Sequence, residues 1–254
     1  EARDTWRHRL AQGSPLATSD SLVNAAWRAA LVTLLLCHER DRGDWVPLGN
    51  PFQYRDVWLR DAARTVRALA VAGYTGMARS DAMTLTRFQL PTGVLLSQRG
   101  QLDGTGQALW TLAQAATLPP APEWAARTLP TVRRALEWLE MQRLLTRQLK
   151  MRYAGLLPYG DPRDNELTRA QLVGNDAWGI AGCRAAATLA RLAGADSLAR
   201  AADSAAADYR WLVLALVVLV VLAVAAAGVV RSEVVALVSG LVLPLALAFE
   251  LHSA

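Results

Sequence analysis

The sequence predicts an all-α protein, in which a series of helical hairpins is followed by a transmembrane helical hairpin. Three observations lead to this prediction. Apolar residues recur at steps of three and four along most of the chain, which is the spacing of a packed helix. No strand-like alternation of any length competes with that spacing. Residues 211–230 form an apolar run without a single charge.

The composition limits the classes of function. The 254 residues are 53% hydrophobic and 19% charged, and they suffice for one large domain or two small ones. The net charge of +5 comes from arginines that are scattered among acids, so we expect a solvated surface and no nucleic-acid partner. Cys37 and Cys183 lie in apolar runs, which predicts buried free thiols. The histidines share no metal-ligand spacing, and we expect neither a metal nor a cofactor.

Three segments follow one another along the chain. Residues 1–20 are polar and irregular, and residues 21–209 carry the helical hairpins. Ser19 or Asp20 can cap a first helix that runs to near Arg40. A loop rich in proline and glycine then leads to the second helix. Residues 210–254 form the membrane segment.

The second helix, over residues 54–73, has an unusual start. Its back half carries an ordinary packing face, whereas its first two turns hold aspartates, arginines and a tryptophan. These are Arg55, Asp56, Trp58, Arg60 and Asp61. Aspartates near a helix start are stabilised by the helix dipole and by the unpaired N–H groups there. On its own, the pattern is explained as well by capping together with ion pairs to Arg55 and Arg60 as by a functional site.

The same kind of helix start recurs twice downstream. Asp103 opens a helix over residues 101–116, with small polar residues before its packing face. Asp176 and Trp178 open a helix over residues 175–194, whose back half is rich in alanine and glycine. Such small residues are typical of an inner helix with close neighbours.

Plainly amphipathic helices alternate with these three. We expect them as the first helix of each pair, over residues 20–40, 76–88 and 123–149, with Pro130 as a candidate break in the last, and a further helix over 196–209. The chain is therefore a loose repeat of helix pairs, in which one helix of each pair starts with an aspartate.

Carbohydrate binding is the chemistry that this repeat favours. If alternate helices form an inner ring, their N-termini meet at one end, and the side chains of these helix starts would share a cavity. Indole faces stack on the C–H face of a pyranose, while carboxylates, guanidinium groups and amides hydrogen-bond its hydroxyls. The side chains that would line the cavity are Asp56, Asp61, Asp103, Asp176, Trp58, Trp178, Arg60 and Gln107. Trp110, two turns inside its helix, is predicted to pack instead.

Four stretches of the sequence carry a resemblance to one enzyme group. They are YRDVWLRDAA, QLDGTGQALWTLA, GLLPYG and NDAWGIAGCRAAATLA, within residues 22–198. The set resembles the six-hairpin glycosidases, the (α/α)6 toroid group that includes glucoamylase-type glycoside hydrolases. The resemblance implies that Trp58, Arg60 and Asp61 bind the hydroxyls of a terminal sugar. The expected substrate-binding residues are Tyr54, Trp58, Arg60, Asp61, Asp103, Gln107 and Trp178.

The same resemblance implies acid/base hydrolysis of α-glucosidic or related oligosaccharides with inversion. In this group the general acid comes from the loop before the sixth helix, which here offers Asp161, Asp164 and Glu166. Glu166 is the expected catalytic acid by position and residue type, and Asp176 is the next catalytic candidate. The usual Trp-Glu-Glu pattern is missing from this loop.

The predicted fold is a partial (α/α)6 toroid. The group takes its general base from the second half of the ring, whereas this chain turns into a membrane segment after its helix pairs. A second chain is therefore a candidate for completing the toroid. The alternative function is a catalytically inactive carbohydrate-binding or truncated relative anchored in the membrane. Two further hypotheses stay open: a toroid with epimerase or lyase chemistry, and a helical-repeat interaction protein whose aspartates only cap helices.

The lipid bilayer is the other expected partner, through residues 211–249. At about 1.5 Å per residue, the run over 211–230 spans roughly 30 Å, the thickness of the hydrocarbon core. Residues 234–249 are short for a span but suit the return arm of a hairpin. We expect a membrane location. Arg210 and Arg231 flank opposite ends of the first run and leave the orientation open.

Overall fold

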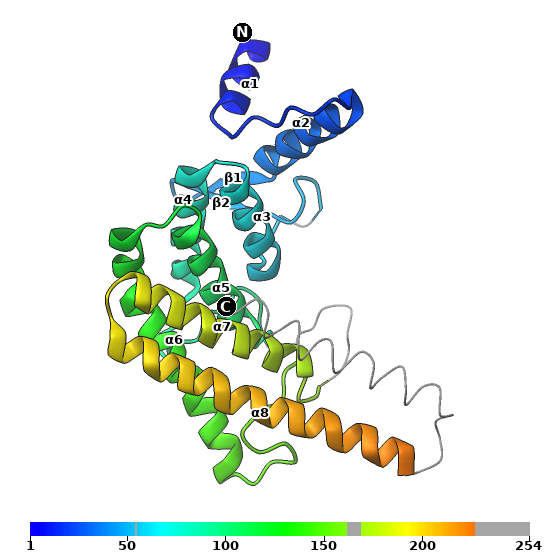
Figure 1. Cartoon of the computed structure of the whole chain (residues 1–254), viewed down its shortest axis with the longest axis vertical. Coiled ribbons are helices and arrows are strands. Elements are labelled where there is room, and N and C mark those ends of the chain that lie inside the picture. The colour runs from blue at the N-terminus through cyan, green and yellow to red at the C-terminus, as the bar shows by residue number, and fades with distance from the viewer. Residues whose placement is uncertain (54, 162–168, 227–254) are drawn as a thin grey trace. The chain divides into compact units, whose positions relative to one another are not determined.

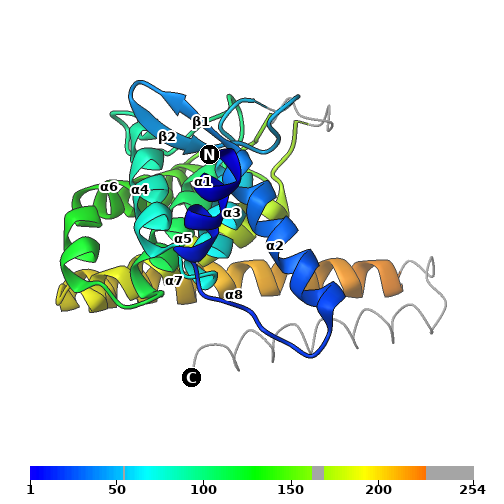
Figure 2. The same ribbon diagram turned by 90° about the horizontal axis from the view of Figure 1, so that it is seen from above.

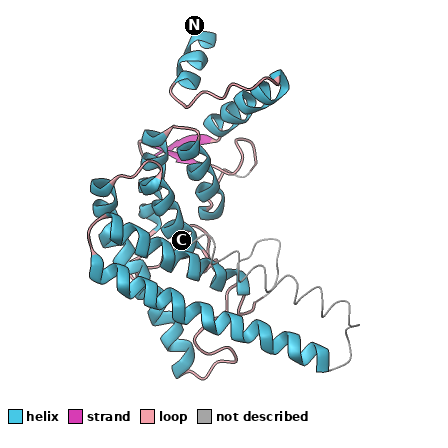
Figure 3. Ribbon diagram, viewed as in Figure 1, coloured by secondary structure: helices cyan, strands magenta, loops and turns pink. Residues whose placement is uncertain are grey.

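The computed structural model describes residues 1–53, 55–161 and 169–226. Within them the regular elements are mostly helices, with one β-hairpin (Figures 1 and 3). The elements are α1 (Ala2–Ala11), α2 (Ser21–Leu36), β1 (His38–Asp41), β2 (Asp44–Pro47), α3 (Leu59–Val71), α4 (Thr75–Leu85), the 3-10 helix η1 (Thr86–Phe88), α5 (Gly104–Thr117), α6 (Pro122–Gln148), α7 (Val173–Leu192) and α8 (Asp196–Ala226). The all-α prediction is confirmed.

The N-terminal segment differs from its prediction. Residues 2–11 were expected to be irregular but form α1, whose acidic first turn and basic last turn suit the helix dipole. Asp20 caps α2 as predicted, because its Oδ1 accepts hydrogen bonds from the backbone N–H groups of Leu22 (2.8 Å) and Val23 (3.3 Å).

The first predicted helix is too long, since α2 ends at Leu36 and a two-stranded antiparallel hairpin follows. The hairpin turns over Arg42 (φ 53°) and Gly43 (φ 94°). Positive φ at both central residues is the conformation that two-residue hairpin loops prefer, and glycine adopts it without strain. Figure 2 shows the hairpin beside α4.

The second predicted helix starts later than expected. The helix α3 begins at Leu59, so Asp56 lies in the preceding loop and is exposed. The prediction that Asp56 belongs to the first turns of this helix is therefore wrong. The alternation of helices holds: α2 and α3, α4 and α5, and α6 and α7 follow one another as expected, and α8 is the further helix. Pro130 lies inside α6 without interrupting it.

The core is centred on α5, which packs against α3, α4, α6 and α7. Eleven of its 14 residues are buried. Glycine makes this possible where α5 meets α7, because a Cβ atom on Gly182 would lie 2.8 Å from Cα of Gly106. The small residues that the sequence shows in these helices are therefore required by close backbone contact.

The chain divides into two compact units, Glu1–Tyr209 and Arg210–Ala254. The helix α8 runs through the boundary, so the last predicted soluble helix and the start of the apolar run form one continuous helix. Its stretch Asp196–Val221 is long and apolar enough to cross a membrane. The predicted return arm lies outside the described residues.

Candidate functional site

The first turns of α3, α5 and α7 lie next to one another in that order. Leu59 begins α3 and Gly104 begins α5, and a Cβ atom on Gly104 would lie 2.9 Å from Cδ1 of Leu59. On the other side of α5, a Cβ atom on Gly106 would lie 2.0 Å from the carbonyl oxygen of Trp178. Only a glycine fits at such distances, so the three aspartate-bearing helix starts are neighbours.

The loops that precede these helices meet at the same end. The backbone N–H of Leu59 donates to Oγ of Ser97 (3.2 Å), in the loop before α5. The backbone N–H of Asp161, in the loop before α7, donates to the carbonyl oxygen of Gly100 (3.2 Å). We call the first turns of α3, α5 and α7, with the described residues of the loops before them, the helix-start end.

Asp103 and Gln107 form a hydrogen-bonded pair at the start of α5. Nε2 of Gln107 donates to Oδ2 of Asp103 at 2.6 Å, across one helical turn. Gln107 is only 1% exposed, whereas Asp103 is half-buried. The amide therefore orients a carboxylate that keeps contact with solvent, and a carboxylate has lone pairs for further donors.

Asp176 points into the protein. Its Oδ1 accepts hydrogen bonds from the backbone N–H of Leu157 (2.8 Å) and from the hydroxyl of Tyr209 (2.6 Å), and the residue is 1% exposed. Burial raises the pKa of this carboxyl above its ordinary value, and the two hydrogen bonds oppose that shift because they stabilise the charged form. Asp176 thus holds the loop before α7 against both α7 and α8.

Arg143 extends this buried network from α6. Its Cζ lies 4.2 Å from the ring centroid of Tyr209, and its Nε donates to the carbonyl oxygen of Gly155 at 2.8 Å. Its other nitrogens reach Glu140 (2.8 Å) and Asp208 (2.5 Å). A guanidinium group that is 1% exposed needs such partners, since an unpaired buried charge is costly. Sequence reasoning missed the role of Arg143, because its ion-pair partner Asp208 lies 65 positions away and no local pattern links the two residues.

The Trp58-Arg60-Asp61 element lies at the start of α3. Trp58 immediately precedes the first helical residue, and Arg60 and Asp61 stand in the first turn. All three are half-buried, so each presents part of its side chain at the helix-start end. Tyr54 and Glu166, which complete the predicted set, lie outside the described residues.

Trp178 packs edge-on against Trp110. The two ring centroids are 6.1 Å apart and the planes meet at 77°, which is a favourable aromatic geometry. Both rings are half-buried. The structure therefore joins Trp178, predicted to bind substrate, to Trp110, predicted to pack, in one aromatic pair.

A buried pair of His38 and Asp81 also escaped sequence reasoning, since the two are 43 positions apart. Nε2 of His38 lies 2.9 Å from Oδ2 of Asp81, and Nδ1 lies 2.9 Å from the carbonyl oxygen of Leu34. The pair fastens the β-hairpin to α4, away from the helix starts. Burial raises the pKa of Asp81, and His38 opposes the shift.

The cysteines are free and buried, and burial raises the pKa of Cys183 to about 12. A thiol with that pKa stays protonated at neutral pH and is a poor nucleophile. In the part of the chain that the structure describes, no group of three or more His, Cys, Asp or Glu side chains could hold a metal ion.

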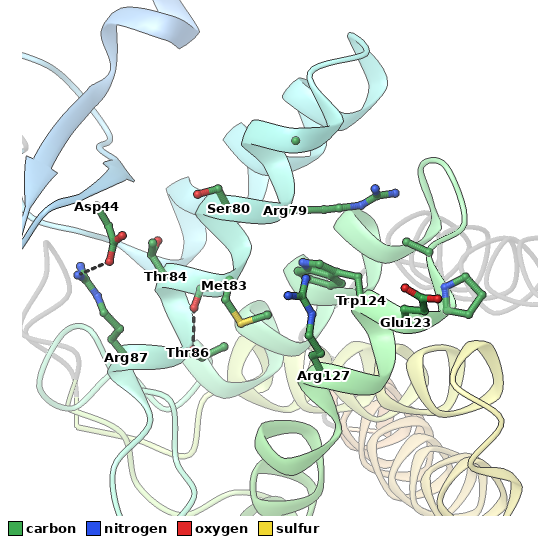
Figure 4. A pocket seen from close by; sticks show the side chains of 13 residues that line it. Asp44, Arg79, Ser80, Met83, Thr84, Thr86, Arg87, Glu123, Trp124 and Arg127 are labelled. Carbon is green, nitrogen blue, oxygen red and sulfur yellow. Dashed lines mark hydrogen bonds and ion pairs between the residues drawn. The ribbon is translucent and has the colours of Figure 1, made fainter.

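A groove of about 1280 Å³ lies between α4 and the start of α6, with the β-hairpin at one side (Figure 4). Arg79 reaches along it from α4, and Arg127 stands beside Trp124 on α6. Arg87 is paired with Asp44 at the far end. Among the residues that the structure describes, none of those predicted for substrate binding or catalysis lines this groove.

No family model matches this sequence, and no curated protein matches it either. Among solved structures, the chain is similar to a GH78 family rhamnosidase of Bacillus sp. GL1, with a TM-score of 0.62 and 21% sequence identity. The match covers 83% of this chain and 22% of that chain. A similarity at this level of identity concerns the fold, and it supports a glycoside hydrolase-like fold for the chain.

Proposed function

We propose that the chain is a glycoside hydrolase-like protein that binds oligosaccharides at the helix-start end. The observation that carries the proposal is the adjacency of the starts of α3, α5 and α7, where Asp61 and Asp176 lie in the first turns of α3 and α7 and Asp103 immediately precedes α5. The similarity of the fold to a rhamnosidase supports a sugar as the ligand, because that enzyme belongs to the glycoside hydrolases.

In this proposal the half-buried polar groups at the helix-start end hydrogen-bond sugar hydroxyls. Arg60 and Asp61 supply charged donors and acceptors from α3, and such charge-assisted hydrogen bonds are shorter and stronger than neutral ones. Asp103, oriented by Gln107, supplies a second carboxylate from α5. The aromatic contacts come from Trp58, Trp178 and Tyr54.

For catalysis we propose acid/base hydrolysis of α-glucosidic or related oligosaccharides with inversion. Glu166 acts as the general acid that protonates the leaving oxygen. Asp176 is the alternative candidate for the general acid. A raised pKa suits a group that must carry a proton near neutral pH, and burial raises the pKa of Asp176 in this direction.

A second candidate is a catalytically inactive carbohydrate-binding protein. Oδ1 of Asp176 already accepts two hydrogen bonds from within the chain, and only 1% of the residue reaches solvent. A carboxylate so engaged serves to fix a loop and is not available as a general acid. The chain spans 22% of the length of the rhamnosidase chain that it resembles. We propose that a second chain completes the toroid.

We further propose that residues 211–249 anchor the protein in a lipid bilayer. Support comes from α8, which continues beyond Tyr209 as a helix with exposed apolar side chains. Trp211, Val218 and Leu219 are examples. A helix with this surface is stable in a bilayer, where its backbone hydrogen bonds are satisfied internally.

Binding and hydrolysis are tested separately. We expect the full chain to bind maltose and Asp61→Asn to weaken that binding, whereas Asp196→Asn, at an exposed position on α8, leaves it unchanged. Release of phenol from an aryl α-glucoside, abolished by Glu166→Gln but not by the exposed control Glu137→Gln, would establish an enzyme. Binding without release favours the inactive relative. If Asp61→Asn binds maltose as the unmodified chain does, the proposed site is wrong.

A further inference from the structure

Both ring nitrogens of His38 face an acceptor. Nδ1 lies 2.9 Å from the carbonyl oxygen of Leu34 on α2, and Nε2 lies 2.9 Å from Oδ2 of Asp81 on α4. A carbonyl oxygen only accepts hydrogen bonds, so Nδ1 carries a proton. The contact with Asp81 needs a second proton, which lies either on Nε2 or on the carboxyl group. In this arrangement the two side chains therefore hold two protons between them.

The unfolded chain holds fewer protons on the same two groups above neutral pH. There a free carboxyl group, with an ordinary pKa of about 3.9, and a free imidazole, with an ordinary pKa of about 6.5, keep one proton between them. The folded pair exceeds that count by one. Stability from the pair is therefore present at lower pH and is lost as pH rises above about 6.5, because the folded state must retain a proton that the unfolded state releases.

Loss of the shared proton leaves one of the two contacts without a donor. If the remaining proton stays on Nδ1, the lone pair of Nε2 faces the carboxylate of Asp81. If it moves to Nε2, the lone pair of Nδ1 faces the carbonyl oxygen of Leu34. The side chains of His38 and Asp81 are 1% and 0% exposed, and Oδ1 of Asp81 is buried without a hydrogen-bond partner. Water does not compensate at such a site, so the ionised carboxyl group is costly there.

The other charged and titratable groups around the pair do not share this proton. On the elements packed around it they are Arg28, Cys37, Glu39, Arg40, Asp41, Asp44, Arg60, Asp61, Arg64, Arg67, Tyr74, Arg79 and Arg87. Arginine and exposed carboxyl groups keep their charge around pH 7. Burial raises the pKa of Cys37 and of Tyr74, so both stay neutral there. Burial also raises the pKa of Asp81, and His38 is the charged group that opposes this shift.

The β-hairpin connects this pair to the helix-start end, although the pair itself lies away from the helix starts. The chain passes from β2 directly into the loop before α3, and β2 packs against α3. The backbone N–H of Leu48 donates to the carbonyl oxygen of Cys37 (2.8 Å), next to His38. Further along the loop, Arg55 pairs with Glu39 on β1 at 2.5 Å. A hairpin that is fastened to α4 therefore also holds the loop that leads to Trp58.

We propose that His38 and Asp81 form a proton-dependent clamp, which holds the β-hairpin against α4 at neutral pH and releases it as the shared proton is lost at alkaline pH. The second part of the inference is that release of the hairpin weakens sugar binding at the helix-start end. This second part rests on the proposed function, whereas the clamp itself does not.

Amide hydrogen exchange of the full chain in detergent micelles tests the clamp. After correction for the intrinsic exchange rate, protection of the amides of β1 and β2 should fall about tenfold or more between about pH 6.5 and about pH 8.5. Asp81→Asn should remove this fall, because an amide Nδ2 donates to Nε2 while Nδ1 still donates to Leu34, with no proton to lose. A contact with a merely structural role predicts the opposite, namely weaker protection of this variant at both pH values. His8→Gln is the matched control, since His8 is exposed on α1, and it should keep the fall.

The dissociation constant of maltose, measured at the same two pH values, tests the effect on the site. It should rise at least about threefold at the higher pH for the unmodified chain and stay constant for Asp81→Asn. Hairpin protection that does not change with pH, or that falls equally in Asp81→Asn, overturns the clamp. A fall in protection with unchanged maltose affinity overturns only the effect on the site. If maltose binds at neither pH, the proposed function fails, and the exchange data still decide whether the clamp exists.

Discussion

The hydroxyl of Tyr209 donates a 2.6 Å hydrogen bond to Oδ1 of Asp176, 33 positions earlier in the chain. The same oxygen accepts the backbone N–H of Leu157. One carboxylate thereby fixes α8, α7 and the loop before α7 with respect to one another. The arrangement makes Asp176 important for stability whatever its part in chemistry.

Tyr209→Phe should destabilise the protein by about 1–3 kcal/mol, because it leaves a buried carboxylate with one hydrogen bond fewer. The loss is measured as a lower midpoint in thermal unfolding of the full chain. Tyr159→Phe is the control, since Tyr159 is 49% exposed. An unfolding midpoint equal to that of the unmodified chain would show that the hydroxyl contributes nothing.

Asp176→Asn should change the dependence of stability on pH. The pKa of Asp176 is raised above 3.8, so the folded state holds its proton over a range where the unfolded state has lost it. Stability from this group is fully present below pH 3.8 and is lost as pH rises through the folded-state pKa. The free energy of unfolding of the unmodified chain, minus that of Asp176→Asn, should therefore fall as pH increases above 3.8. A difference that is constant between pH 3 and pH 7 would contradict this account of the buried carboxyl.

Gly106→Ala should force α5 and α7 apart. The new Cβ atom would lie 2.0 Å from the carbonyl oxygen of Trp178, which is backbone and cannot turn away. Overpacking of this kind costs about 1–3 kcal/mol or more, and we expect a corresponding loss in the free energy of unfolding. Gly76→Ala on α4 is the control, because a Cβ atom there meets nothing within 4 Å. Equal stability of the two variants would rule out the close contact between α5 and α7.

Val220→Arg should reduce membrane association of the full chain. A charge near the middle of the 211–230 run costs about 2.5–3.5 kcal/mol in membrane insertion. The measurement is the fraction of protein that sediments with membranes after alkaline washing. Val220→Leu is the control and should remain with the membranes. If the unmodified chain is already soluble after the wash, residues 211–249 do not anchor it.

Sequence periodicity predicted most of the helices to within a few residues, because a buried helical face repeats every three to four positions wherever the helix packs. Its errors lie where the local pattern is weak. Arg42-Gly43 forms a hairpin turn between strands of only four residues, too short for an alternation to be recognised. Trp58 and Asp56 seemed to belong to a helix that begins only at Leu59.

The candidate site could be predicted only in part. The aspartates at the starts of α5 and α7 are visible in the sequence, and the structure brings these helix starts together. The sequence does not reveal that Asp103 is half-buried and hydrogen-bonded to Gln107, whereas Asp176 is buried and hydrogen-bonded to Tyr209. Both are aspartates at helix starts, and their surroundings differ only through segments that are distant in the sequence.

By itself, then, the sequence determined which segments are helical and that residues 211–230 are apolar on every side, since both depend on the order of neighbouring side chains. Only the tertiary structure decided that His38 pairs with Asp81, that Arg143 is buried beneath Tyr209, and that Trp110 on α5 contacts both Arg67 on α3 and Trp178 on α7. The physical reason is that burial and pairing depend on which helices pack together, and such contacts join residues dozens of positions apart.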